Sequence, residues 1–371
     1  MSLRIAVDAT PLLVRSAGVK GYIWHWIQAM RARAGSAAIQ AFPFMGELPP
    51  LRHDRSVYPA VATYPRIAAV HASNKIPGLI DTLTATANVF HCSNQIRRKP
   101  THCRLTATIH DLTSWSHTSQ HLKGTLRLDF DFAERVLKRA DGLIAVSDNT
   151  RRDAIEYLGI DPDKIRRIYS GVPPVYFNVT AAQTEGARSA VGLTKSYVLY
   201  VGTIEPRKNL DRLLSAWSTL PNDLLSENEL AIAGPYGWGS ETTMALLQRN
   251  PKGVRYLGYV GEEHLPGLTA GALFVAYPSL YEGFGFPVAQ AMAAGVAVLT
   301  SNTSCLPEIA GDAAVYVDPL SATEMAEALK LLLTSPSLRD RLSAAGRLRA
   351  VNYTWDRCAA ESIQFFQELS G

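Results

Sequence analysis

Short apolar runs alternate with helical patterns through both halves of the chain, and this alternation constrains the fold more than any other feature. Apolar runs bounded by turn residues predict buried strands. The strands predicted in this way are Leu3–Val7, Ile39–Phe44, Asn88–His91, Leu105–Ile109, Gly142–Val146 and Ile165–Tyr169 in the first half, and Tyr197–Val201, Glu229–Ala233, Val254–Leu257, Leu273–Tyr277, Val296–Thr300 and Ala314–Val317 in the second. Strands that alternate with helices favour an α/β fold with parallel sheets.

The helical patterns between these strands complete two similar halves. They predict helices near Gly21–Arg33, Leu122–Arg139, Asp148–Leu158, Asn209–Leu220, Thr243–Arg249, Ala322–Leu333 and Leu338–Val351, and a last helix from Thr354 to Leu369. A chain of 371 residues is long enough for two domains. We therefore predict two doubly wound, Rossmann-like domains, over residues 1–172 and 173–353. The segment Val172–Ala190, rich in proline and small residues, is predicted to be the linker.

Composition is that of an ordinary globular protein, but the charge is uneven. The net charge of +4 divides into +9 over Met1–Gly171 and −5 from Val172 onward. The basic first half is compatible with an anionic membrane or acceptor and equally with solvated arginine-rich helix faces. The cysteines lack metal spacing, no nucleic-acid motif is present, and the N-terminus reads as a strand rather than a secretory signal. These features predict a cytoplasmic protein, with peripheral membrane contact left open.

The segment Tyr277–Gly295 carries the strongest chemical pattern. A strand ends at Pro278, and a lone carboxylate, Glu282, precedes the turn Gly283–Phe284–Gly285. A compact helix then follows Pro287. A glycine turn at a helix start offers backbone N–H groups to an anion, and a carboxylate accepts hydrogen bonds from sugar hydroxyls. The segment predicts a site for a sugar attached to a phosphate, although a tight turn alone would show part of the same pattern.

Two adjacent cations follow a strand in the second half. In Val201–Leu210 the residues Arg207 and Lys208 come just before a predicted helix, where cations are unfavourable unless an anion is bound. An arginine fork beside a lysine suits a diphosphate. We therefore predict that both residues bind one, against the alternative of two solvated charges.

The first half offers weaker candidates. His110 follows the strand Leu105–Ile109 and is predicted to line a site, whereas Asp111 is predicted to form a turn. Between the first strand and the first helix, Gly18 and Gly21 would allow a phosphate close to the backbone, and Lys20 would add charge.

These segments together resemble the retaining glycosyltransferases of family 4, which have the GT-B fold. The resemblance implies two Rossmann-like domains facing a central cleft, with the acceptor on the first and a nucleotide-diphosphate sugar on the second. It also implies that the last helix, 354–371, packs on the first domain. The family signature is Glu, seven residues, Glu; its first position is Glu282, but its second is Gln290.

The resemblance also assigns roles. His110 and Glu282 are the catalytic candidates; Arg207, Lys208, Gly18 and the turn Gly283, Phe284 and Gly285 bind the diphosphate; Tyr259, Val260 and Gln290 bind the nucleoside. Thr203 stands where the family usually has arginine, and Arg207 supplies the guanidinium. This variant resembles bacterial mannosyltransferases of polysaccharide assembly. It implies retaining transfer of a hexose, with GDP-mannose as the first guess, to a glycan or lipid-linked acceptor.

No metal or cofactor is predicted. Asp129 and Asp131 have a D-x-D spacing, but inside a helix their side chains would point about 200° apart. Two other functions remain open from the sequence. Gln290, an amide in place of a carboxylate, suits a catalytically weakened partner or scaffold protein, and the fold would also suit a sugar-nucleotide epimerase.

Overall fold

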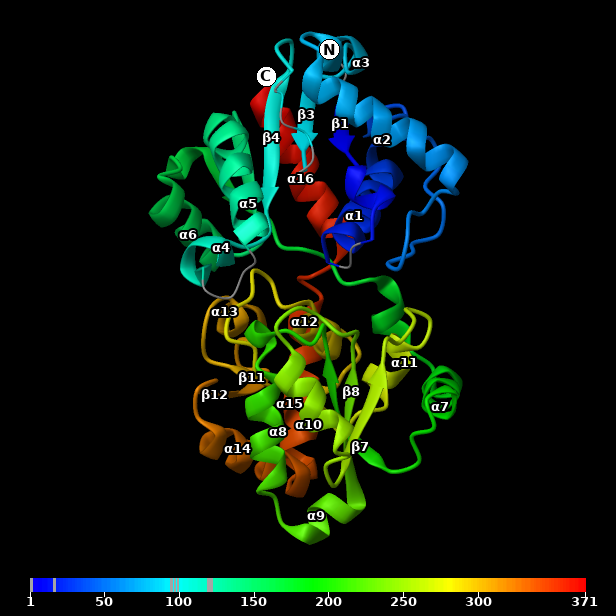
Figure 1. Cartoon of the computed structure of the whole chain (residues 1–371), viewed down its shortest axis with the longest axis vertical. Coiled ribbons are helices and arrows are strands. Elements are labelled where there is room, and N and C mark those ends of the chain that lie inside the picture. The colour runs from blue at the N-terminus through cyan, green and yellow to red at the C-terminus, as the bar shows by residue number, and fades with distance from the viewer. Residues whose placement is uncertain (1–2, 16–17, 94–95, 97, 99, 119–122) are drawn as a thin grey trace. The chain divides into compact units, whose positions relative to one another are not determined.

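The computed structural model describes residues 3–15, 18–93, 96, 98, 100–118 and 123–371. They form two compact units, one of residues up to Gly171 together with Trp355–Gly371 and one of Val172–Thr354 (Figure 1). Within the described residues, each unit is built on a six-stranded parallel sheet flanked by helices. The predicted α/β fold with two Rossmann-like halves is therefore confirmed.

The sheet of the first unit has the strand order β2-β1-β3-β4-β5-β6. Its strands are β1 (Ile5–Asp8), β2 (Ile39–Phe42), β3 (Val89–Cys92), β4 (Arg104–Ile109), β5 (Gly142–Ala145) and β6 (Ile165–Arg167). All are parallel to their neighbours, and their near-continuous burial matches a sheet covered on both faces. Each lies where the sequence predicts a strand, with ends displaced by a few residues.

The helices of the first unit are α1 (Gly18–Ala34), α2 (Ala60–Lys75), α3 (Leu79–Leu83), α4 (Thr113–Ser116), α5 (Lys123–Arg135), α6 (Asp148–Leu158) and α16 (Trp355–Ser370). The last helix lies against α1, where the indole of Trp26 donates to Ser362 at 3.0 Å (Figure 1). The sequence analysis missed α2 because its apolar residues do not mark a buried face. Thr63 and Ser73 are buried, whereas Val61 and Tyr64 are 82% and 70% exposed.

The sheet of the second unit has the order β12-β11-β10-β7-β8-β9. Its strands are β7 (Ser196–Val201), β8 (Asn228–Ala233), β9 (Val254–Gly258), β10 (Phe274–Tyr277), β11 (Ala297–Ser301) and β12 (Ala314–Val317). Its helices are α7 (Ala181–Ala190), α8 (Leu210–Ser218), α9 (Asn222–Glu227), α10 (Glu241–Gln248), α11 (Leu265–Ala270), α12 (Phe286–Ala293), α13 (Leu306–Ala310), α14 (Ala322–Thr334) and α15 (Pro336–Ala350).

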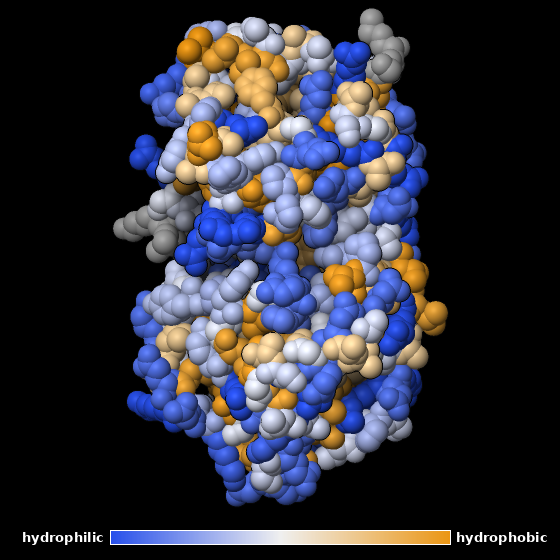
Figure 2. All heavy atoms as spheres, turned by 90° about the vertical axis from the view of Figure 1, so that its right-hand side faces the viewer, coloured by the Kyte–Doolittle hydropathy of each residue, from blue (hydrophilic) through white to orange (hydrophobic). Residues whose placement is uncertain are grey.

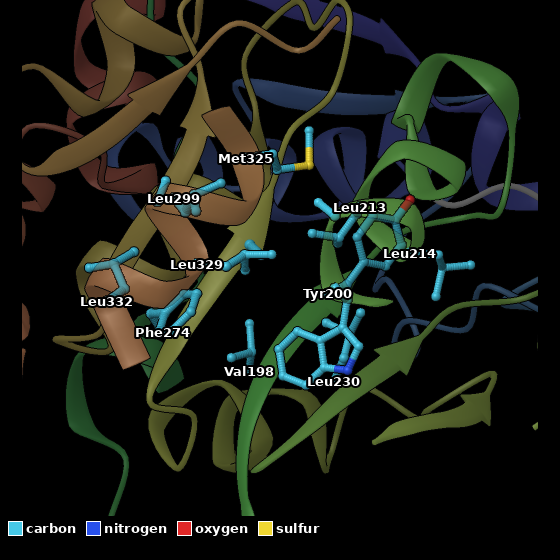
Figure 3. Packing of buried hydrophobic residues seen from close by; sticks show 14 of the residues in the cluster. Val198, Tyr200, Leu213, Leu214, Leu230, Phe274, Leu299, Met325, Leu329 and Leu332 are labelled. Atoms are coloured by element: carbon cyan, nitrogen blue, oxygen red, sulfur yellow. The ribbon is translucent and has the colours of Figure 1, made fainter. Parts of the chain in front are cut away.

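One buried cluster joins this sheet to several of its helices, α8 and α14 among them. Figure 3 shows Leu213 of α8 and Leu329 of α14 packed over the strand residues Val198 and Phe274. Packing of this kind fixes the ends of β7 and β10, which carry the candidate site.

The predicted linker is wrong. Residues 172–190 contain a 3-10 turn at Pro174–Asn178 and the helix α7, and they belong to the second unit. Thr180 and Gln183 form a capping box at the start of α7. Helix α7 then packs on α11 so closely that a Cβ at Gly267 would lie 2.5 Å from the Gln183 carbonyl oxygen. Composition suggested a linker, whereas the Thr-x-x-Gln spacing already marked a helix start.

Candidate donor site

Glu282 is the centre of a buried polar cluster in the second unit. It follows β10, and its Oε1 accepts hydrogen bonds from Lys208 Nζ at 2.5 Å and from the hydroxyls of Tyr277 and Ser279 at 2.7 Å each. Its Oε2 accepts one from Arg207 at 3.1 Å. Burial raises the pKa of this carboxyl, but Lys208 and Arg207 outweigh it and lower the pKa to about 2. Glu282 is therefore ionised throughout the physiological range.

The backbone of the loop that carries Glu282 is held from two sides. On one side are hydroxyl groups of β11 and of the residues that follow it. Thr300, Ser301 and Thr303 donate to the carbonyls of Tyr277, Ser279 and Leu280, respectively. The Ser304 hydroxyl accepts a hydrogen bond from the Glu282 amide. From the other side, the buried Asn209 amide donates to the carbonyls of Pro278 and Pro319. This bonding satisfies the buried backbone and fixes the position of the carboxylate.

The sequence analysis missed these supporting residues. Asn209 and Ser304 both have left-handed backbone conformations, with φ of 59° and 52°. Such conformations are costly for residues other than glycine, and they cluster at functional sites. The hydroxyl-rich segment Ser301–Ser304 was the available signal, because a run of small hydroxyl residues after a strand offers many short-range donors.

Arg207 and Lys208 both bond to Glu282, a pairing that the sequence analysis did not predict, and their local structure also differs from the prediction. They lie in a 3-10 turn, Pro206–Lys208, and α8 begins only after Asn209. Arg207 also donates to the Tyr281 carbonyl at 2.7 Å and to Glu205 at 2.8 Å. The anion expected beside these cations is thus supplied in this structure by two carboxylates of the chain. Burial lowers the pKa of Lys208, and Glu282 opposes that effect.

The turn Gly283–Phe284–Gly285 leads into α12. Gly285 has a φ of 81° and is the residue before the helix, and a Cβ there would lie 2.8 Å from Leu306. The Phe284 ring packs against Tyr353, so only its backbone can serve a ligand. Because Pro287 has no N–H and the Val288 amide donates to the Gly285 carbonyl, Phe286 supplies the helix-start amide. The sequence analysis did not name Phe286.

The nucleoside candidates lie on different elements. Gln290 is partly exposed on α12, and within the described residues its side chain has no hydrogen bond. Tyr259 and Val260 follow β9, with Tyr259 55% exposed and Val260 buried. Two strands separate β9 from β10, so these residues follow a strand about 14 Å from the one that leads to Glu282. The structure therefore brings Arg207, Lys208 and Glu282 together but leaves Tyr259 and Val260 outside that cluster.

His110 belongs to the first unit, at the end of β4. Its ring makes an edge contact with Tyr22, with 4.7 Å between ring centroids. Burial lowers its pKa to about 4, although Asp111 opposes the shift, so the imidazole is neutral at pH 7. Asp111 accepts from the amide and hydroxyl of Thr113, which confirms the predicted turn.

The phosphate loop expected near Gly18 is only partly supported. Ser16 and Ala17 lie outside the described residues, and Gly18 begins α1 with an exposed backbone. The expectation is wrong for Gly21, which lies inside the helix, and for Lys20. The Lys20 ammonium is buried and donates to the carbonyls of Val14 and Arg55, so it joins two loops instead of facing a phosphate.

The carboxylates of the D-x-D segment have separate partners. Asp129 accepts from Ser114 and Asp131 pairs with Arg135. Among the described residues there is no group of three or more His, Cys, Asp or Glu side chains that could hold a metal ion. In the same part of the chain, no helix is long and apolar enough to cross a membrane.

The structure thus places a carboxylate and two cations together after β7 and β10, neighbouring strands of the Rossmann-like second unit. Two family models match the chain: "Glycosyltransferase Family 4" over residues 18–175 and "Glycosyl transferases group 1" over residues 183–349. The O-antigen chain mannosyltransferase B of Escherichia coli is 32% identical over 269 residues, which cover 72% of this chain and 71% of that protein. The chain therefore belongs to the glycosyltransferases that these two models describe, group 1 and family 4.

Solved structures show the same fold. The sucrose-phosphate synthase of Thermosynechococcus elongatus matches with a TM-score of 0.76 and 20% identity, covering 99% of both chains. The Anabaena protein HepE, solved in complex with UDP, matches with a TM-score of 0.70 and 16% identity, covering 99% of this chain and all of that one. The fold is therefore GT-B.

Proposed function

We propose that the protein is a retaining, metal-independent mannosyltransferase that transfers mannose from GDP-mannose to a glycan or lipid-linked oligosaccharide. The name of the E. coli relative supports mannosyl transfer, and the UDP complex of HepE supports a nucleotide-sugar donor. The observation that carries the proposal is the cluster of Glu282 with Arg207 and Lys208.

The donor binds to the second unit in this proposal. Arg207, Lys208 and the backbone of Gly283–Gly285, extended by the Phe286 amide, hold the diphosphate and stabilise the charge that develops as it leaves. Glu282 accepts hydrogen bonds from hydroxyls of the sugar. Gln290 bonds the ribose, and Tyr259 and Val260 contact the base.

Retention of configuration at the anomeric carbon is best explained if the acceptor hydroxyl attacks from the same face that the leaving group occupies. A double-displacement enzyme needs a carboxylate nucleophile beside the anomeric carbon. Glu282 suits that role poorly, because both of its oxygens accept hydrogen bonds from donors of the chain and its pKa is about 2. We infer instead that the departing phosphate assists the acceptor hydroxyl. His110 of the first unit, neutral at pH 7, serves as a hydrogen-bond partner of the substrate.

We also propose that the first unit contacts an anionic membrane from the cytoplasmic side. With the last helix included, this unit has 24 Lys and Arg residues against 17 Asp and Glu. Helix α2 has no acidic residue, and Val61 and Tyr64 are exposed on it. Arg52 and Arg55 line a hollow near the start of this helix. Figure 2 faces the side on which α2 lies in Figure 1 and shows apolar surface beside hydrophilic side chains. Apolar and basic residues together suit an anionic lipid surface.

The direct test is a transfer assay with GDP-mannose, GDP-fucose, UDP-glucose and UDP-galactose, with and without a mannosylated lipid-linked acceptor. The proposal predicts acceptor-dependent release of GDP from GDP-mannose, no loss of rate with EDTA, and an α-linked product by NMR. Replacing His110 by Ala should lower turnover without abolishing GDP binding. Release that never depends on an acceptor, an inverted product, or an epimerised donor would each contradict it.

A further inference from the structure

Glu205 is an acidic residue of the site to which neither the sequence nor the family resemblance assigns a role. It follows β7, and its Oε1 accepts a hydrogen bond from Arg207 at 2.8 Å. Its side chain is largely buried, with 13% exposed. Since the other terminal nitrogen of the same guanidinium bonds Glu282, the side chains form a chain of alternating charge, Glu205–Arg207–Glu282–Lys208.

This chain of charges is neutral, which conflicts with binding a diphosphate. Two carboxylates balance the two cations, whereas a nucleoside diphosphate brings further negative charge. Like charges that lie within a few ångströms of each other in a partly buried site repel strongly, because the effective dielectric constant there is lower than in water. Binding of the donor is therefore more favourable if one carboxylate gives up its cation.

The two carboxylates are not equally replaceable. Glu282 is held by the hydroxyls of Tyr277 and Ser279 as well as by both cations. Among the described residues, the Glu205 carboxylate has one hydrogen-bond partner, Arg207. Loss of that contact frees an Arg207 N–H group for a phosphate oxygen and leaves the anchored Glu282 in place.

We propose that Glu205 is an internal substitute for the donor diphosphate: it pairs with Arg207 before the donor binds, is displaced when the donor binds, and pairs with Arg207 again as the nucleoside diphosphate leaves. This inference rests on the proposed function. It gives Glu205 the role of setting donor affinity and product release, because the carboxylate competes with both ligands for one guanidinium.

The test is calorimetric titration of the protein with GDP, UDP and pyrophosphate. Glu205→Gln keeps the size of the side chain and removes its charge, so it should tighten binding of GDP and pyrophosphate by about threefold or more. Glu205→Asp keeps a negative charge in the site and should stay within about twofold of the parent. Glu229→Gln is the matched control, because Glu229 also lies in the second unit, pairs with Arg255 and is 15% exposed.

Turnover gives a second measurement. The KM for GDP-mannose should fall in Glu205→Gln, inhibition by GDP should strengthen, and both should be unchanged in Glu229→Gln. If Glu205 instead only holds Arg207 in place, Glu205→Gln will bind GDP equally or more weakly, and the inference is wrong. If the parent protein binds none of the three ligands, the proposed function fails and this inference fails with it. Equal thermal unfolding temperatures of the variants ensure that a difference in affinity is not a loss of fold.

Discussion

The ammonium group of Lys208 lies 2.5 Å from Oε1 of Glu282, although 74 residues separate them in the sequence. The contact joins the turn after β7 to the loop after β10, two strands that are neighbours in the sheet. The Tyr277 hydroxyl lies 2.7 Å from both groups, so it connects the cation to the carboxylate. This arrangement keeps Glu282 ionised inside the protein, so stability should depend on pH and ligand binding on these residues.

Stability should depend on pH through Glu282. Its pKa is about 2 in the folded protein against 4.5 for the ordinary group, so its contribution is complete above pH 4.5 and is lost as pH falls toward 2. A shift of this size corresponds to about 3 kcal/mol of unfolding free energy. Urea unfolding between pH 6 and pH 3 should show a steeper loss for the parent than for Glu282→Gln. Parallel losses in the two proteins would show that the carboxyl is not stabilised in this way.

Ser304 provides a test of the strained support beneath Glu282. Its φ of 52° is unfavourable for a residue with a Cβ, and its hydroxyl accepts from the Glu282 amide at 3.0 Å. Both Ser304→Ala and Ser304→Gly lose this hydrogen bond, but only the glycine relieves the backbone. The alanine variant should therefore be less stable than the glycine variant by about 1 kcal/mol. The reverse order in urea unfolding would mean that Ser304 is not strained in solution.

Substitutions at Gln290 and at Glu282 should affect nucleoside binding and sugar binding separately. Gln290→Leu should weaken GDP binding by about 0.5–1.5 kcal/mol, the net value of a neutral hydrogen bond, and Gln290→Glu should be tolerated. Glu282→Gln should reduce turnover of GDP-mannose more than it reduces affinity for GDP, because its proposed partner is the sugar. Calorimetry with GDP, together with turnover of the full donor, distinguishes the two positions. If Gln290→Leu binds GDP as tightly as the parent, Gln290 does not bond the ribose.

The sequence predicted the sheets well because buried parallel strands are short apolar runs with clear ends. It also indicated Glu282, Arg207 and Lys208, since cations just before a helix are unfavourable without an anion and a carboxylate beside a glycine turn suits sugar hydroxyls. It could not show that the two cations pair with Glu282, because that pairing depends on which strands are neighbours in the sheet. The partners of Asn209 and Ser304 depend on the same strand order, although the hydroxyl-rich segment Ser301–Ser304 could have suggested a supporting role. Helix α2 lacks a buried apolar stripe, so no periodicity could reveal it.

Membrane contact should depend on the exposed side of α2. Replacing Val61 and Tyr64 by Asp removes two exposed apolar side chains and adds negative charge, so sedimentation with phosphatidylglycerol vesicles at low salt should fall. The matched control replaces Leu331 and Leu348 by Asp, which makes the same kind of change on exposed positions of α14 and α15. Loss of binding in both double variants would show a general charge effect, and absence of binding by the parent at low salt would end the proposal.

The most direct test of the donor site is calorimetric titration of GDP-mannose into the double variant Arg207→Ala/Lys208→Ala. Each cation should contribute about 1.5–3 kcal/mol as a charged hydrogen-bond donor, so the pair should lower affinity by about a hundredfold or more. Lys330→Ala/Arg341→Ala removes two exposed cations from the same unit and should bind like the parent. If the folded Arg207/Lys208 double variant binds GDP-mannose as tightly as the parent, these residues do not hold the diphosphate and the site has been placed wrongly.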